Sequence, residues 1–252
     1  MTTGIFQGTH ACSGIAGSWP QSGADVVVSP PAAPAEAAAA GLVVLDLPDD
    51  GLPEALAAVR AGTAEGAVLS LSPTAPFAVL RALAGPGRTL FRAVVPLGTK
   101  PGEGVAALAA EPGTPADAVE TVKTALAWTG IVEVVAEDAL DAVAALALGG
   151  ASFLCEALQG MEEGAVRDGL PRDTARAFAH QTALATALLL QSHPGSPADL
   201  KDQVASPSGT TIAALASLED AGVRGAYLRA VQRTAVEVRR RLDSACTAMI
   251  EQ

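Results

Sequence analysis

The first half of the chain alternates short apolar runs with amphipathic helical segments, and this alternation limits the folds that the chain can adopt. Strands separated by helices pair in parallel, because a parallel pair needs a long crossover connection. The runs expected as strands and the segments expected as helices are these: strands at 4–6, 25–29, 42–47, 67–71, 92–95 and 131–135, and helices at 52–60, 76–83 and 119–129. The alternation predicts an α/β domain with a parallel sheet over residues 1–136.

From Glu137 onward the pattern is helical throughout, which predicts an all-α domain over residues 137–252. We expect Gly149-Gly150 to interrupt the first helix, a second helix over 152–166, and a third that begins at Pro171. The last helix carries an apolar seam at spacings of three and four, formed by Leu228, Val231, Ala235, Val238 and Leu242. Such a seam packs either on a core or on a partner helix.

The charge balance favours small-molecule chemistry. With 16 basic and 27 acidic residues, the net charge is -11, which opposes non-specific binding to nucleic acid or to anionic membranes. The N-terminus lacks a basic region and no apolar run approaches about 18 residues, so we expect a cytoplasmic protein. Cys12, Cys155 and Cys246 lack metal-ligand spacing, which predicts neither a disulfide framework nor a metal site but three buried small side chains.

Residues 199–222 combine a short polar helix, a hydroxyl-rich turn and a second helix. The first helix is expected to stop before Pro207, and the second to run from near Gly209 to Gly222. Ser208, Thr210 and Thr211 can cap the second helix with their side-chain oxygens. The same geometry leaves N–H groups and hydroxyls able to hold a small anion or a carboxylate, so the spacing alone leaves both interpretations open.

The run Leu200-Lys201-Asp202-Gln203-Val204, then Ser206-Pro207, Gly209-Thr210-Thr211, and Leu218-Glu219 with Gly222 and Arg224, resembles the C-terminal signature of pyrroline-5-carboxylate reductases. The resemblance continues more weakly through 102–105 and 141–143, so that it covers nearly the whole chain. It implies a Rossmann-like N-terminal domain followed by an all-α dimerisation domain, with a substrate pocket at a homodimer interface. Thr211 would then be the catalytic residue that hydrogen-bonds or protonates the imine nitrogen, with Ser206, Ser208, Gly209 and Thr210 as further substrate-binding residues.

The cofactor-facing motifs of that family are degenerate in this chain. The dinucleotide loop would be Gln7, Gly8, Thr9 and His10, and the three glycine positions of its fingerprint are occupied by Gln7, Thr9 and Cys12. The segment between residues 29 and 42 leaves little room for the extra strand and helix usual in the family, so the domain is expected to be shortened. Residues 47–50 replace the family's Val-Lys-Pro motif, and no asparagine stands where the family has Met-Pro-Asn-Thr-Pro.

Three functions follow from these observations. Because several cofactor-facing motifs have departed together, the preferred hypothesis is a derived enzyme that carries out cyclisation, isomerisation or dehydration of an amino-acid-derived intermediate without a nicotinamide cofactor. The first alternative is a reductase that transfers hydride from NADPH or NADH to a small cyclic imine such as pyrroline-5-carboxylate. The second alternative is a non-catalytic dimeric binding protein.

Overall fold

The computed structural model describes residues 3–7, 26–29, 40–62, 66–96, 101–204 and 209–250. The chain divides into two compact units, Met1–Leu148 with Arg233–Gln252, and Gly149–Gln232, because the long helices α5 and α9 each contribute to both. The proposed domain boundary at residue 136 follows a different criterion, the last strand, since β7 ends at Val134.

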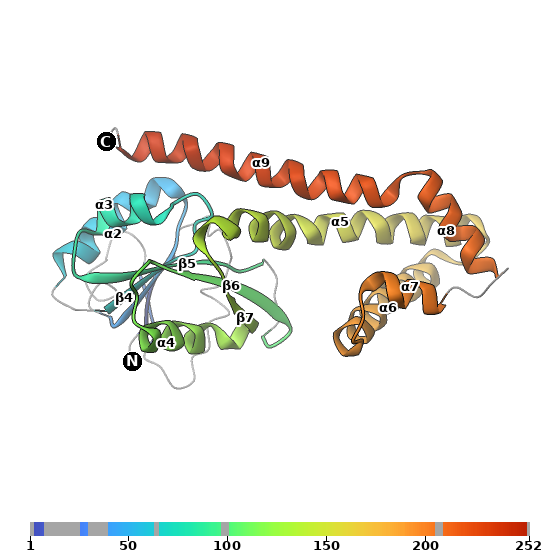
Figure 1. The fold of residues 1–252 in the computed structure, drawn as a ribbon, viewed down its shortest axis with the longest axis horizontal. Helices are drawn as coiled ribbons and strands as arrows, with labels where there is room; N and C mark the ends of the chain where they lie inside the picture. Colours follow the sequence, from blue (N-terminus) through green and yellow to red (C-terminus); the bar gives the residue numbers. More distant parts are fainter. Residues whose placement is uncertain are drawn as a thin grey trace. The chain divides into compact units, whose positions relative to one another are not determined.

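A seven-stranded sheet with the order β2-β1-β3-β4-β5-β6-β7 forms the first unit (Figure 1). Its strands are β1 (Thr3–Gln7), β2 (Val26–Ser29), β3 (Leu42–Asp46), β4 (Gly66–Ser70), β5 (Arg88–Val94), β6 (Gly104–Ala110) and β7 (Gly130–Val134). Strands β1 to β5 pair in parallel, which confirms the Rossmann-like α/β prediction. One pair departs from the parallel arrangement, since β5 and β6 are antiparallel. Nine residues join these two strands, too few for a crossover connection.

Helices cover both faces of this sheet. Helices α2 (Leu52–Ala61) and α3 (Phe77–Ala84) lie on one face, and α4 (Ala116–Leu126) lies on the other (Figure 1). The strand side chains alternate between two buried clusters accordingly. Leu45 and Val68 pack with α2 and α3, whereas Leu69, Phe91 and Leu108 pack with α4. Because successive strand residues point to opposite faces, one apolar strand supplies both clusters.

The region before β3 is only partly described. The predicted strands at 4–6 and 25–29 are confirmed as β1 and β2, and of the described strands only β2 lies beyond β1 in the sheet. The alanine run at residues 35–40 predicts a brief helix, but it falls mostly outside the described residues.

Close backbone approach explains one glycine of the sheet. Gly130, the first residue of β7, has φ of +123°, and a Cβ there would overlap the backbone carbonyl oxygen of Gly104 in β6. A side chain at this position would therefore strain the backbone and push the two strands apart. Gly113, in the turn before α4, also has a positive φ of +90° but has open space around its Cα.

The second half of the chain is helical, as predicted, and its helices are α5 (Leu140–Arg167), α6 (Arg172–Ser192), α7 (Pro197–Val204), α8 (Thr210–Asp220) and α9 (Val223–Ile250). The predicted break at Gly149-Gly150 is wrong, since α5 passes through both residues without interruption. Neither glycine has a positive φ. A glycine within a helix costs only about 1 kcal/mol, so the pair weakens the helix without ending it.

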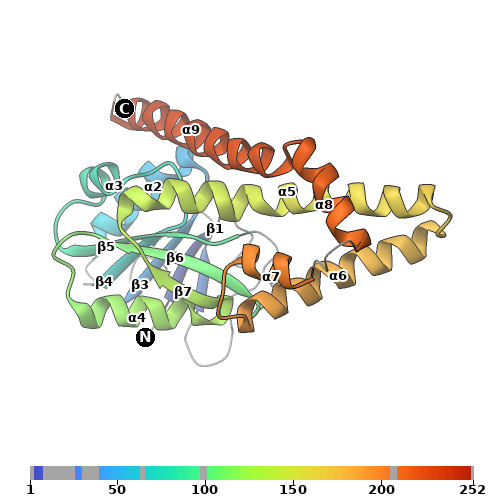
Figure 2. The same cartoon turned by 45° about the vertical axis from the view of Figure 1, so that its right-hand side comes forward.

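Helix α6 turns back from the end of α5, and α7 and α8 follow it (Figure 2). The turn is fixed by Glu162 of α5, whose carboxylate accepts hydrogen bonds from Arg172 at 2.9 Å and Arg176 at 3.4 Å. Among the described residues of 149–204 and 209–232, the buried apolar side chains are Ala175, Ala179 and Leu200. The larger apolar side chains of this unit are exposed, among them Leu154, Met161, Phe178, Leu184, Leu188, Ile212, Leu218 and Leu228.

Candidate active site

The strand order predicts a ligand-binding crevice at the carboxyl ends of β1 and β3. Strand β1 lies between β2 and β3. The chain therefore adds β2 on one side of β1 and then crosses over to add β3 on the other side. In doubly wound sheets, ligands bind outside the carboxyl ends of the strands at this point of reversal. Gln7 ends β1 and stands in register with Asp46, a fully buried residue that ends β3. The other residues of the predicted loop, Gly8, Thr9 and His10, lie outside the described residues.

Beside this crevice, the loop after β4 carries a chain of buried hydroxyl groups. The backbone N–H of Ser72 donates to Oγ of Ser70 at 3.3 Å, and the backbone N–H of Thr74 donates to Oγ of Ser72 at 3.1 Å. The side-chain oxygens of Ser72 and Thr74 are also 3.1 Å apart and share a hydrogen bond. These bonds hold the loop in one conformation at the edge of the sheet.

A pocket of about 740 Å³ opens at the same edge. Pro48 lines it from the loop after β3, and Pro73 and Thr74 line it from the loop after β4. The rest of its wall comes from helices of the same unit, namely Leu148 of α5 and Thr234, Glu237, Val238, Arg240, Arg241 and Ser244 of α9. Its volume lies within the range of pockets that hold small molecules and cofactors.

An ion pair between buried Arg92 and partly exposed Glu137 also supports this edge. Arg92 of β5 donates from Nη1 to Glu137 Oε1 at 2.9 Å and from Nη2 to the carbonyl oxygen of Pro73 at 3.0 Å. The same Glu137 oxygen accepts the backbone N–H of Phe77, the first residue of α3, at 2.7 Å. Three segments of the chain therefore meet at one carboxylate.

The second set of predicted site residues lies at the start of α8. Gly209 is the residue before the helix, and Thr210 and Thr211 are its first two residues, with exposed side chains. The structure thus brings Gly209, Thr210 and Thr211 together, whereas Ser206 and Ser208 lie outside the described residues. The expected division into a polar helix and a second helix is confirmed as α7 and α8.

Helix α7 is capped by hydrogen bonds in both directions between Ser196 and Asp199. Both the backbone N–H and the hydroxyl of Ser196 donate to the carboxylate of Asp199, at 2.6 and 2.7 Å, and the backbone N–H of Asp199 donates to Ser196 Oγ at 3.3 Å. These bonds from Ser196 hold the pKa of the Asp199 carboxyl below its usual value. Lys201 of α7 lies 3.6 Å from Glu219 of α8, which links the two helices across the turn.

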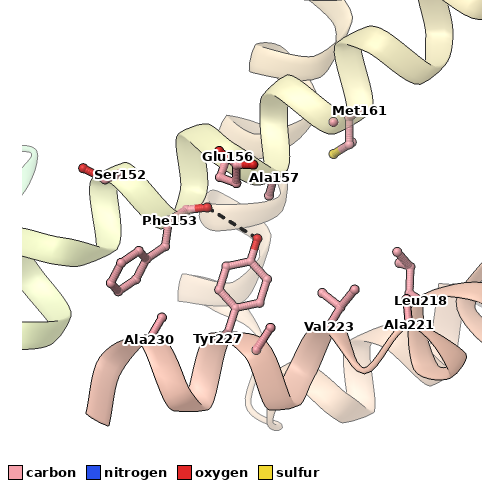
Figure 3. A pocket seen from close by; sticks show the side chains of 12 residues that line it. Ser152, Phe153, Glu156, Ala157, Met161, Leu218, Ala221, Val223, Tyr227 and Ala230 are labelled. Carbon is pink, nitrogen blue, oxygen red and sulfur yellow. Dashed lines mark hydrogen bonds between the residues drawn. The ribbon is translucent and has the colours of Figure 1, made fainter. Parts of the chain in front are cut away.

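The helical unit also contains an apolar pocket of about 970 Å³ between α5 and the segment formed by α8 and α9 (Figure 3). The hydroxyl of Tyr227 donates across it to the carbonyl oxygen of Phe153 at 3.4 Å. The remaining wall is built from small and apolar side chains, with Ser152 and Glu156 as its polar members, and includes Ala157, Met161, Leu218, Val223 and Ala230. An open apolar surface of this kind is typical of a protein interface.

Some of these residues were missed by sequence reasoning. Arg92 itself was an available signal, because it is a charged residue inside an apolar strand and a buried arginine needs a partner. No spacing rule could have identified Glu137 as that partner across 45 residues. The expectation that all three cysteines are buried is wrong for Cys155, which is exposed on α5.

Comparison with known proteins places these features in a family. A family model described as pyrroline-5-carboxylate reductase dimerisation matches residues 137–241. A pyrroline-5-carboxylate reductase from Synechocystis is 35% identical over 183 residues, which cover 71% of this chain and 68% of the relative. By length and composition alone the segment Glu137–Arg167 could cross a membrane, but it coincides with the start of the matched dimerisation domain.

Solved structures show the same fold. The 1-pyrroline-5-carboxylate reductase of Streptococcus pyogenes superposes with a TM-score of 0.80 at 21% identity, covering 94% of this chain and 98% of that one. The pyrroline carboxylate reductase of Plasmodium falciparum, solved with NADP bound, superposes with a TM-score of 0.74 at 16% identity, covering 94% of this chain and 86% of that one.

Proposed function

Because this chain belongs to the pyrroline-5-carboxylate reductase family, we propose that it reduces a small cyclic imine, pyrroline-5-carboxylate or a close analogue, with NADPH as the hydride donor. The observation that carries the proposal is the joining of a doubly wound sheet, with its point of reversal between β1 and β3, to a dimerisation domain of that family. The first part offers a place for a dinucleotide, and the second carries the signature that contains Thr211.

The carboxyl edge of the sheet has room for the nicotinamide end of such a cofactor. The pocket beside Pro48, Pro73 and Thr74 is large enough for the ring and its ribose, and the buried hydroxyls of Ser72 and Thr74 keep its wall rigid. When bound, the cofactor supplies a hydride to the imine carbon. The residues of this chain then have to orient the two ligands, exclude water and supply the proton that the imine nitrogen takes up.

We assign that proton to the site at the start of α8. The exposed hydroxyl of Thr211 can donate to the imine nitrogen, which becomes more basic as hydride reaches the neighbouring carbon. The first N–H groups of α8, at Thr210 and Thr211, have no partner within the helix and suit the substrate carboxylate. Ser206, Ser208 and Gly209 would complete the turn around that carboxylate.

The exposed apolar surface of residues 149–232 supports a homodimer as the working form. A single copy leaves Phe178 with 68% and Leu188 with 57% of their surface exposed. A surface this apolar is stable in water when another subunit covers it. We therefore propose a soluble homodimer whose second copy covers the helical unit.

The preferred sequence-based hypothesis, chemistry without a nicotinamide cofactor, gains no support from the relatives, whose names are those of reductases. It rests on Gln7, Thr9 and Cys12 at the glycine positions of the fingerprint. The predicted absence of a cofactor is likewise unsupported, since one structural neighbour carries NADP. The non-catalytic alternative leaves the retained signature around Thr211 without a role.

One experiment separates these alternatives. NADPH is titrated into the purified protein and its fluorescence is followed, and the loss of NADPH absorbance is then measured with pyrroline-5-carboxylate. Saturable binding and imine-dependent oxidation would support the reductase. Turnover of an imine without NADPH would favour cofactor-independent chemistry, and neither binding nor turnover would leave the binding-protein alternative.

A further inference from the structure

Arg92 is a buried charged residue in an otherwise apolar part of the sheet. It lies in the middle of β5 with 3% of its side chain exposed, between buried neighbours Phe91 and Ala93. A buried guanidinium is stable only where its charge and its hydrogen-bond donors are matched. Glu137 supplies the opposite charge, and the carbonyl oxygen of Pro73 supplies a second acceptor. The third nitrogen of the guanidinium, Nε, is buried and has no partner among the described residues.

The two terminal nitrogens of Arg92 bind two different segments, so the planar guanidinium fixes the distance between them. Nη1 reaches the short helix η4 (Glu137–Ala139), and Nη2 reaches the loop that follows β4. Pro73 and its neighbour Thr74 are wall residues of the pocket at the carboxyl edge. The Arg92–Glu137 ion pair is therefore joined to the pocket wall by a single hydrogen bond, from Arg92 to the carbonyl oxygen of Pro73.

Glu137 also acts directly on a second segment of that edge. Its Oε1 atom accepts the first backbone N–H of α3, which follows the pocket loop after only two further residues. A carboxylate at the start of a helix is stabilised by the free N–H groups and the helix dipole. The loop of residues 73–76 is thus held at its beginning through Arg92 and at its end by Glu137 itself.

We propose that Glu137 is a positioning residue for the cofactor, which acts through Arg92 and the N-terminus of α3 to hold the Pro73–Thr74 wall of the pocket where the nicotinamide end binds. This inference rests on the proposed function. Glu137 is assigned no contact with a reacting atom, and its Oε1 atom already accepts hydrogen bonds from Arg92 and Phe77. Its role is to keep the loop from relaxing outward when the pocket fills.

A second arginine–glutamate ion pair, Arg81 with Glu111, provides a matched control. Arg81 of α3 pairs with Glu111 and donates to the carbonyl oxygens of Gly85 at 2.7 Å and Arg88 at 2.8 Å. These partners lie at the C-terminal end of α3 and the start of β5, the opposite edge of the sheet from the pocket. Glu111→Gln therefore removes an equivalent charge from the same fold without touching the pocket loop.

The test compares Glu137→Gln and Arg92→Lys with Glu111→Gln on the full-length protein. Glutamine keeps an oxygen that accepts the Phe77 N–H but cannot neutralise Arg92, and lysine keeps the charge but loses the fork that joins two segments. We expect both pocket-side variants to raise the NADPH dissociation constant on the order of tenfold, since a site wall must be held within about 0.5 Å. The imine KM and the kcat at saturating NADPH should stay close to those of the unaltered protein.

Each result bears on the inference. An NADPH dissociation constant that is unchanged in Glu137→Gln and in Arg92→Lys, or that rises equally in Glu111→Gln, would overturn it and leave the reductase standing. All four proteins are compared at a temperature below their melting transitions, so that unfolding of a variant is not mistaken for weaker NADPH binding. If the unaltered protein binds no NADPH at all, the proposed function fails, and the positioning role fails with it.

Discussion

Replacing Thr211 by valine tests the proposed chemistry most directly. The substitution removes one hydroxyl and keeps both the shape and the β-branching of the side chain. Thr211 is exposed at the second position of α8, and no hydrogen bond joins its hydroxyl to another residue of the described chain. Little stability therefore depends on this hydroxyl within one subunit, and we expect the free energy of unfolding to change by less than about 0.5 kcal/mol.

The expected loss of activity is larger. A hydroxyl that donates to the imine nitrogen in the transition state is worth about 1 to 3 kcal/mol when its partner is left unpaired. Since about 1.4 kcal/mol corresponds to a tenfold change in rate, kcat/KM for the imine should fall roughly 5- to 160-fold. The dissociation constant for NADPH should not change, because Thr211 is assigned to the imine alone.

The assay is steady-state imine reduction with thermal melting on the same preparation. Thr186→Val on α6 is the control, because that threonine is also exposed, and its hydroxyl donates to the backbone carbonyl of Thr182 at 2.8 Å. It should leave kcat/KM unaltered. A Thr211→Val enzyme that keeps kcat/KM within about twofold of the unaltered protein would refute the assignment of the proton donor to this hydroxyl.

Three further expectations concern the fold and the assembly. Phe178→Asp should convert the dimer to monomer in sedimentation at micromolar concentration, whereas His180→Asp on the same helix should not, and a monomeric unaltered protein would contradict the dimer. Gly130→Ala should lower the urea-unfolding free energy by about 2 kcal/mol or more, against about 1 kcal/mol for Gly113→Ala, whose added methyl meets no atom. The pKa of Asp199 is lowered by its bonds from Ser196, so its contribution to α7 is present above the unfolded pKa and is lost as the pH falls through the acid range. The protection factors of the α7 amides, which correct for the intrinsic exchange rate, should fall over that interval, and Asp199→Asn should remove this change.

The sequence predicts the α/β unit well because its strands are short, apolar and separated by clear helical segments. The pairing direction of β6 could not be predicted in the same way. Its run of glycine, valine, alanine and leucine between Gly104 and Ala110 carries no periodicity of its own, and its antiparallel pairing follows from the short connection to β5. Pairing direction depends on where the chain can return, which is a property of the sheet and not of the strand.

The helical half shows a different limit. Gly149 and Gly150 have the composition of a turn, but α5 continues through them, because a helix of 28 residues tolerates two glycines when its other residues favour the helix. The signature residues around Thr211 were found because they form one continuous run. Arg92 and Glu137 were not, because their contact joins a strand to a helix across 45 residues, and only the folded sheet brings them together.

A degenerate dinucleotide loop is compatible with a retained reductase signature, because the loop affects the binding of the cofactor and the signature affects the reaction. The glycine positions occupied by Gln7, Thr9 and Cys12 serve the pyrophosphate, which does not change during hydride transfer. Contacts to such a remote group bind the ground state and the transition state equally, so their loss raises KM for the cofactor and leaves kcat unchanged. The hydroxyl of Thr211 would instead contact the reacting imine. A reductase with weakened affinity for NADPH but with turnover preserved at saturating cofactor is therefore the behaviour that these substitutions predict.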